Sequence, residues 1–188
     1  MAHLEREDIL DFVTYGERRE AIRASAMAAK DLRRVHLGGH LTFLFENVET
    51  IRYQVLEMVR VEKMVRAADI QHELDTYNGV LGGPGELGCT LLIEIEDERE
   101  RDVLLRRWRG LPGHVFMTFA DGSRAAARFD QSQMNEEKLS SVQFLKFDAG
   151  GRTPAALVCD LPGLEGTVHL AEPTRQALLS DLGPQPGR

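Results

Sequence analysis

The chain has 188 residues, of which 43% are hydrophobic and 28% are charged, and this balance is typical of a single globular domain with one sizeable core. Its 30 acidic residues outnumber its 23 lysines and arginines, and the formal net charge of -7 argues against a nucleic-acid binder, because phosphate contacts need an excess of clustered cations. No secretory signal opens the sequence and no apolar run reaches membrane-spanning length, so we expect a cytoplasmic protein without membrane contact.

The N-terminal segment, residues 4–32, is rich in charged residues and alanine and contains no proline, which favours helix. Gly16 is the one residue in it that interrupts the helical pattern. We therefore expect two helices in this segment, with Gly16 at the joint and the second helix over residues 18–32.

A β-hairpin is predicted next, because Gly38 and Gly39 lie between two β-rich runs and both can adopt positive φ. In a two-residue turn, His36 lies opposite Leu41, on the same side of the hairpin as Phe43. His36 is therefore expected to be semi-buried. It is either a core or interface histidine that is hydrogen-bonded to backbone, or a ligand-binding residue.

Asn47 is a suitable N-cap for a helix that runs to about Arg66. The apolar positions of this helix recur at helical spacing: Val48, Ile51, Val55, Met58, Val59 and Val65. Projection at about 100° per residue places Glu62 inside the apolar stripe. A buried carboxylate needs a partner. Glu62 is therefore predicted either to pair with an arginine and fix the helix packing, or to act as a binding or catalytic carboxylate.

A second helix is predicted over residues 69–81, and the glycines and proline of residues 82–85 end it. The helix has a polar face and an apolar stripe on opposite sides. His72, Asp75 and Thr76 lie on the polar face. The stripe itself, which would face the core, consists of Ile70, Leu74, Tyr77 and Leu81.

The polar residues of this helix are candidates for a binding site. His72, Asp75, Thr76 and Asn78 are mediocre helix formers, and their use costs about 1 to 2 kcal/mol without a return in stability. Glu73 flanks the apolar stripe beside them. We therefore expect this part of the helix to border a pocket or a partner surface. The alternative is that Asp69 and Asp75 merely favour the N-terminal half of the helix and that Asn78 begins its exit.

A divalent metal is a candidate cofactor of the same helix. Asp69 and His72 stand at i and i+3, which resembles half of a carboxylate-bridged di-iron motif. A complete site of that kind needs two such pairs and two further carboxylates, and the sequence offers one pair. Asp69 and His72 are the candidate ligands, and an exposed, capping or interface role is the alternative for His72.

The remaining sequence predicts strands, most of them in hairpins, and two further helices. The signals are apolar and polar alternation, glycine-containing turns and a charged helical segment. The elements are a half-buried strand over 88–96, a helix over 97–109 with Val103, Leu104 and Trp108 on its inner side, a hairpin of 114–119 and 123–129, strands over 142–147, 155–159 and 166–170, and a last helix from near Pro173.

The two cysteines, Cys89 and Cys159, lie far apart and belong to no paired-cysteine motif. The sequence therefore does not indicate a disulfide framework, a zinc knuckle or an iron–sulfur cluster. Cys89 shares the expected face of its strand with Leu91, Ile93 and Ile95. We expect both cysteines to be reduced thiols in the core.

These elements predict a single α+β domain with one mainly antiparallel sheet, because strands that come as hairpins pair antiparallel. Helices over 47–81 and 97–109 are expected to cover the sheet. We divide the chain into a main domain over 1–148, a C-terminal extension over 149–182 that packs on the same domain, and a disordered tail over 183–188.

Residues 33–36, 44–47 and 71–78, together with the helix that carries Glu57 and Glu62, resemble the bacterial domain-of-unknown-function family 3501. The run over 71–78 is the most specific part, and the C-terminal part matches less clearly. Members of that family have no established activity and no assigned catalytic residues. Their genes commonly lie beside those of rubrerythrin-like and iron–sulfur, heterodisulfide-reductase-like proteins, so the resemblance implies a redox or peroxide-defence setting.

Catalytic and nucleotide-binding motifs, such as a phosphate-binding glycine loop, a nucleophile elbow or a zinc-protease helix, are missing from the sequence. Our leading hypothesis is therefore a non-enzymatic accessory or binding protein that acts beside a rubrerythrin-like or iron–sulfur partner. The rival is a metal-dependent or small-molecule enzyme that uses Glu62, His72 and Glu73. A third alternative is a structural homodimer module.

Overall fold

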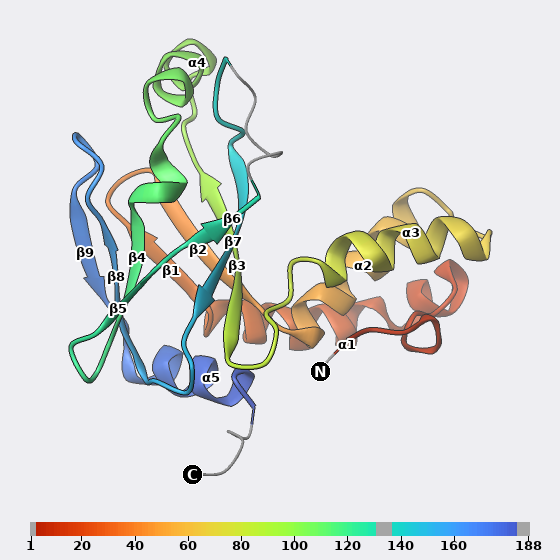
Figure 1. Ribbon diagram of the computed structural model, residues 1–188. Coiled ribbons are helices and arrows are strands. Elements are labelled where there is room, and N and C mark those ends of the chain that lie inside the picture. Colours follow the sequence, from red (N-terminus) through yellow and green to blue (C-terminus); the bar gives the residue numbers. More distant parts are fainter. Residues whose placement is uncertain (1–2, 131–136, 184–188) are drawn as a thin grey trace.

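In the computed structural model, which describes residues 3–130 and 137–183, the strands form two antiparallel sheets (Figure 1). The first sheet has the order β1-β2-β3-β7-β6 and the second the order β5-β4-β8-β9. The strands are β1 (Arg34–Leu37), β2 (Leu41–Glu46), β3 (Glu86–Ile93), β4 (Val115–Phe119), β5 (Arg124–Ala126), β6 (Arg128–Phe129), β7 (Val142–Asp148), β8 (Pro154–Cys159) and β9 (Gly166–His169).

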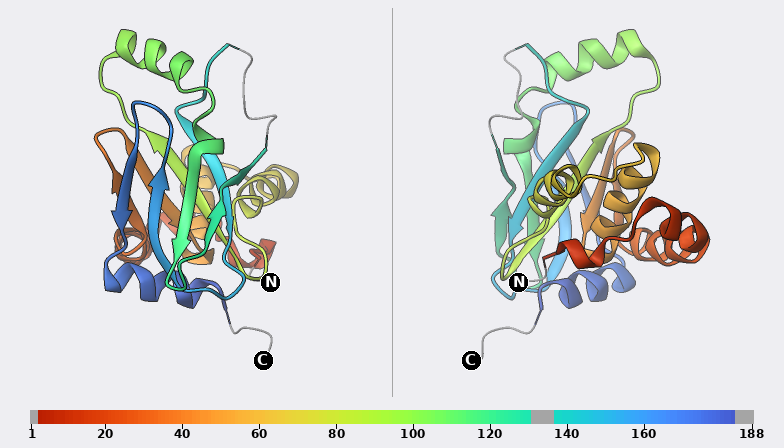
Figure 2. Two further views of the ribbon diagram at one scale, coloured as in Figure 1. Left: turned by 60° about the vertical axis from the view of Figure 1, so that its left-hand side comes forward. Right: turned by 90° about the vertical axis from the view of Figure 1, so that its right-hand side faces the viewer.

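The helices lie outside these sheets (Figure 2). Within the described ranges, none of them is long and apolar enough to cross a membrane. They are α1 (Phe12–Asp31), α2 (Val48–Val61), α3 (Ala67–Asn78), α4 (Glu98–Arg107) and α5 (Glu172–Asp181), with short 3-10 helices η1 (Arg6–Asp8) and η2 (Leu111–His114).

The two sheets pack face to face around one hydrophobic core. Phe43, Leu91 and Leu145 of the first sheet and Met117 and Leu157 of the second are all fully buried in it. Figure 2 shows α5 across one end of the sheets and α4 beyond the other. The α+β class is therefore confirmed. The single predicted sheet is wrong, since the chain crosses from one sheet to the other between β3 and β4, between β5 and β6, and between β7 and β8.

A second core lies between the helices and the outer face of the first sheet. We call η1, α1, α2 and α3 the helical lobe. Tyr15, Val55 and Leu74 are fully buried in this second core, and Phe144 from the outer face of β7 packs against it. Asn47 caps α2 as predicted, because its side chain accepts a hydrogen bond from the backbone N–H of Thr50 at 3.0 Å.

The prediction of two helices in the N-terminal segment is wrong. One helix, α1, begins after the N-cap Asp11 and passes through Gly16 without a break. A glycine inside a helix costs only about 1 kcal/mol. Burial of Tyr15 and Ala26 on either side of Gly16 offsets that cost.

The first hairpin is confirmed, but its predicted register is wrong by one residue. Leu37 pairs with Leu41 and His36 with Thr42, so the turn has three residues instead of two. A shift of one residue turns every side chain to the other face of a strand. His36 is therefore exposed on the outer face of the first sheet and does not share the side of Phe43.

The predicted burial of Glu62 is also wrong, because α2 ends earlier than its apolar pattern suggests. The backbone N–H of Met64 donates to the carbonyl of Val59 at 3.0 Å, and Lys63 adopts a positive φ of 49°. This is a Schellman motif with lysine at the position that glycine usually occupies. Glu62 is exposed, and Val65 beyond it is 76% exposed.

The charged helix α4 does not cover a sheet, in contrast to the prediction. It is joined to the rest of the fold mainly through buried Leu105 and Trp108. Val103, which we expected on the inner side, is 63% exposed.

Residues 149–182, predicted as an extension, supply β8, β9 and α5 and so complete the second sheet and its core. Arg33 and Asp181 form an ion pair with Nε–Oδ2 and Nη2–Oδ1 distances of 2.7 and 2.8 Å, and this pair ties α5 to the start of β1. Of the predicted disordered tail, Gly183 alone is described and the rest lies outside the described residues.

Candidate binding groove between the first sheet and the helical lobe

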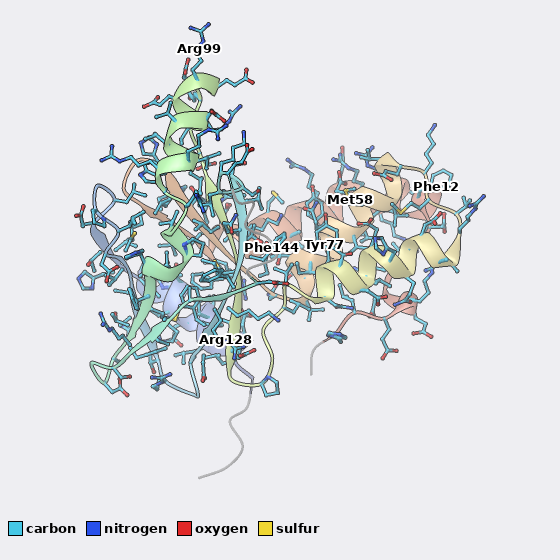
Figure 3. The ribbon with its side chains drawn as sticks, turned by 45° about the horizontal axis from the view of Figure 1, so that its top comes forward. Phe12, Met58, Tyr77, Arg99, Arg128 and Phe144 are labelled. Carbon is cyan, nitrogen blue, oxygen red and sulfur yellow. The ribbon has the colours of Figure 1, made fainter. Side chains whose placement is uncertain are left out.

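A groove runs along the junction of the helical lobe and the first sheet. Its larger hollow has a volume of about 580 Å³. Figure 3 shows Tyr77 and Phe144 at this junction and Arg128 on the neighbouring strand. The end of α3, β6 and β7 supply the lining, which is Thr76, Gly79, Val80, Arg128, Phe129, Asp130, Phe144, Leu145 and Lys146.

Successive side chains of β7 point to opposite faces of the sheet, and those on the outer face form the floor of the larger hollow. Leu145 and Phe147 point into the core between the sheets, so Phe144 and Lys146 project from the outer face. In the ladder between β6 and β7, Arg128 lies directly opposite Lys146. An aromatic ring and two cationic side chains therefore share one small area of the outer face.

The two cations of the floor are not equivalent. The guanidinium of Arg128 forms an ion pair with the carboxylate of Glu86, and that carboxylate also accepts a hydrogen bond from the backbone N–H of Gly83 at 3.1 Å. Lys146 takes part in no ion pair with residues 3–130 or 137–183. The ammonium group of Lys146 is therefore the uncompensated positive charge of the groove floor. Asp130 lies in the same wall and has an interaction of its own.

A smaller hollow of about 350 Å³ continues the groove. It shares Gly79 and Lys146 with the larger one. Gly79 has helical dihedral angles of -60° and -23°, which every residue type can adopt, so its backbone does not require glycine. The two shared residues make the hollows neighbours along the same junction. The lining of the smaller hollow is His3, Asp75, Asn78, Gly79, Leu81, Gly82, Gly83, Glu86 and Lys146.

Asn78 holds the N-terminal segment against α3 at the edge of the smaller hollow. Its side-chain oxygen accepts from the backbone N–H of Leu4 at 3.0 Å, and its side-chain nitrogen donates to the carbonyl of Leu4 at 2.9 Å. Asn78 is buried, so this residue of the predicted polar set has a structural task.

Asn78→Ala is expected to lower the free energy of unfolding by about 2 kcal/mol, because two buried hydrogen bonds are lost and both backbone groups of Leu4 lose their partner. Urea denaturation measures the change. Thr76→Ala is the matched control, since the Thr76 hydroxyl is exposed and bonds only the carbonyl of His72 in its own helix. Equal midpoints for the two variants would contradict the structural task of Asn78.

The other candidates from α3 are distributed over the surface. Thr76 lies in the wall of the larger hollow and Asp75 in the wall of the smaller one, where its carboxylate accepts from Gln71 Nε2 at 2.8 Å. His72 and Glu73 line neither hollow. The groove thus contains part of the predicted polar face.

The candidate metal ligands Asp69 and His72 are both exposed. Across the part of the chain that the structure describes, no three His, Cys, Asp or Glu side chains lie so that they could hold a metal ion. The half of a di-iron motif that Asp69 and His72 form in the sequence is therefore not completed by other residues that the structure describes.

His36 lies away from the groove, in a chain of hydrogen bonds on the outer face of the first sheet. Its Nδ1 is 2.8 Å from Thr42 Oγ1, and that hydroxyl donates to Glu94 Oε2 at 2.5 Å. Because the single Thr42 proton goes to the carboxylate, the nitrogen of His36 that faces Thr42 is the donor. The partner of His36 is a side chain and not the predicted backbone group.

Glu57 is the most strongly perturbed carboxylate, and it lies inside the helical lobe. It accepts hydrogen bonds from Arg19 Nε at 2.7 Å, Tyr15 Oη at 2.6 Å and Arg60 Nη2 at 3.1 Å. The bond from Arg19 is the main reason why the pKa of Glu57 falls from 4.5 to about 2. Both oxygens are occupied by side chains of α1 and α2, so this carboxylate fixes helix packing.

Sequence reasoning missed the groove residues Arg128, Phe129, Phe144 and Lys146. One signal was present, since Phe144 is an aromatic residue on the face of its strand opposite to Leu145. The helix that covers this face comes from a distant part of the chain, and periodicity does not indicate which helix packs on which strand.

Comparisons with known proteins place the chain beside proteins whose function is also unknown. The family described as "Protein of unknown function (DUF3501)" matches residues 3–182. The crystal structure of a novel protein of unknown function from Burkholderia pseudomallei is similar, with a TM-score of 0.87 and 31% sequence identity, and the match covers 96% of this chain and 99% of that chain. No curated protein matches.

Proposed function

The chain belongs to the DUF3501 family of proteins of unknown function, and for this member we propose a non-enzymatic binding role in which the groove holds a small molecule. The observation that carries the proposal is the larger hollow, because its volume of about 580 Å³ is within the range of small-molecule sites. Phe144 gives it an apolar floor, and a few polar groups surround that floor, which is the usual composition of such sites.

Binding is favoured over catalysis because the acidic groups of the groove are already engaged. Glu86 is bonded to Arg128 and Gly83, and Asp75 is bonded to Gln71. The described lining contains no hydrogen-bonded pair of nucleophile and base of the kind that covalent catalysis uses.

We further propose that this binding protein acts beside a rubrerythrin-like or iron–sulfur partner, which the gene neighbourhood of the family motivates. The two thiols are poorly placed for redox chemistry of their own. Cys89 and Cys159 are buried, and burial raises the pKa of both thiols, which disfavours the reactive thiolate. A redox contribution would therefore depend on the bound molecule or on the partner.

The proposed function is tested with N-phenyl-1-naphthylamine, an uncharged aromatic probe whose fluorescence rises in an apolar site. We expect saturable binding to the parent protein, and Phe144→Ala is expected to raise the Kd about tenfold, because loss of an aromatic contact and its buried area is worth about 1.4 kcal/mol. A fluorescence titration gives the Kd.

Phe12→Ala is the matched control. Phe12 packs, like Phe144, as a partly buried residue against the core of the helical lobe, but Figure 3 shows it at the outer end of the lobe, away from the groove. The same loss of affinity in both variants, or no saturable binding to the parent, refutes the groove as a binding site.

A further inference from the structure

We propose that the ligand of the groove is an amphipathic acid, with its anionic group on Lys146 and its aromatic or long apolar body on Phe144. This inference rests on the proposed function and specifies the chemical class of the molecule that is bound. It also assigns a binding role to Lys146, which is the point where the two hollows meet.

The arrangement of the floor indicates that an anion is needed there. Arg128 and Lys146 are direct partners in the ladder between β6 and β7, and like charges opposite each other destabilise a sheet. Glu86 compensates Arg128 and leaves Lys146 without a partner in the described part of the chain. An acidic group bound at Lys146 removes this repulsion, and a neutral or cationic ligand does not.

The carboxylates of the groove define where the anionic group of the ligand can lie. Asp130 is in the wall of the larger hollow, and Asp75 is in the wall of the smaller one. Asp75 repels an anion, so the acidic group is directed to the floor that the two hollows share, where Lys146 lies. On β3 the residue paired with Lys146 is Gly88, and the backbone of residues 80–82 packs closely where a side chain at position 88 would lie.

The apolar body of the ligand is accommodated by the larger hollow. Phe144 projects from the outer face of β7 and is partly exposed, and Val80 adds to the apolar lining. The smaller hollow adjoins the larger one at Gly79 and Lys146. The shape and the charge of the groove thus fit one molecule with an acidic head and an apolar body.

The test compares two probes that differ by one acidic group, 1-anilinonaphthalene-8-sulfonate and the uncharged N-phenyl-1-naphthylamine. Lys146→Met keeps most of the apolar stem and removes the charge. It is expected to raise the Kd of the sulfonate about tenfold and to change the Kd of the uncharged probe less than twofold. The sulfonate affinity of the parent is also expected to fall with added salt.

Arg99→Met is the matched control, because it removes one exposed positive charge on α4, which Figure 3 shows far from the groove. If Lys146→Met weakens both probes equally, or if Arg99→Met has the same effect on the sulfonate, the assignment of the acidic group is overturned while groove binding stands. If neither probe binds and the chain sediments as a concentration-dependent dimer, a second copy covers the groove and both proposals fail.

Discussion

Gly88→Ala is expected to destabilise the protein by about 3 kcal/mol or more. A Cβ atom at position 88 would lie 2.0 Å from the carbonyl oxygen of Val80 and 2.9 Å from the backbone nitrogen of Gly82. Both are backbone atoms, so the clash is relieved only if β3 and the segment after α3 move apart. The change is measured as a shift of the urea unfolding midpoint.

The matched control is the same substitution at Gly16, which is expected to act in the opposite direction. Gly16 lies inside α1 and a Cβ atom there would meet nothing within 4 Å. Alanine in a helix interior is about 0.5 to 1 kcal/mol more favourable than glycine. If Gly88→Ala unfolds at the midpoint of the parent, the close approach of β3 to residues 80–82 is wrong, and the wall of the groove that it positions is wrong with it.

Glu57→Gln is expected to lower the free energy of unfolding at pH 7 by about 2 kcal/mol. The carboxylate is 17% exposed and pairs with Arg19 and Arg60, which keep 35% and 37% of their side chains exposed. Because solvent screens the charges of these two arginines, the expected loss of stability is smaller than the lowered pKa alone would imply. Thermal or urea unfolding at pH 7 measures the difference.

The contribution of Glu57 depends on pH in a defined direction. Its pKa is about 2 in the folded protein against an ordinary value of 4.5, so the ionised form is favoured by folding. The stabilisation is complete above pH 4.5 and is lost as the pH falls toward 2. The stability difference between the parent and Glu57→Gln is therefore expected to shrink over this window.

Asp102→Asn provides the comparison for Glu57. Asp102 is also bonded to two cationic side chains, Arg106 and Lys138, and they lower its pKa, but it is exposed on α4. We expect its unfolding midpoint to stay close to that of the parent, since exposed ion pairs contribute little. If Glu57→Gln and Asp102→Asn lose the same free energy of unfolding, the enclosure of the Glu57 carboxylate between α1 and α2 adds nothing to the stability of the protein.

The elements with strong local signals could be predicted from the sequence. Asn47 and Asp97 are side chains that cap helices, and both α2 and α4 begin directly after them. The alternation around Cys89 predicted β3, and Cys89 is fully buried as expected. These signals depend on neighbouring residues alone, which is why single-sequence reasoning detects them.

The wrong predictions concern places where two local backbone conformations are close in energy. Gly38 and Gly39 suit a two-residue or a three-residue turn equally, and the choice decides which face His36 occupies. The end of α2 is marked by Lys63 in a conformation that glycine usually adopts, so the sequence carries no stop signal there. The exposure of His36 and Glu62 follows from these two points.

The groove could not be predicted, because its parts come from separated segments. Thr76 and Gly79 end a helix, Arg128 lies on a two-residue strand, and Phe144 and Lys146 belong to a later strand. Which of these segments meet is decided by the packing of whole elements. The sequence indicated that residues 75 and 76 were available for binding, and their neighbours across the groove were set by tertiary structure.

Because the molecule has two hydrophobic cores, we expect two cooperative units with a shared boundary. The helical lobe has a core of its own, and Phe144 is a point at which the first sheet packs against that core. Lobes of this kind can open sub-globally while the remainder stays folded. A ligand bound in the groove as we propose would contact both units, so by thermodynamic linkage we expect it to raise the free energy of lobe opening.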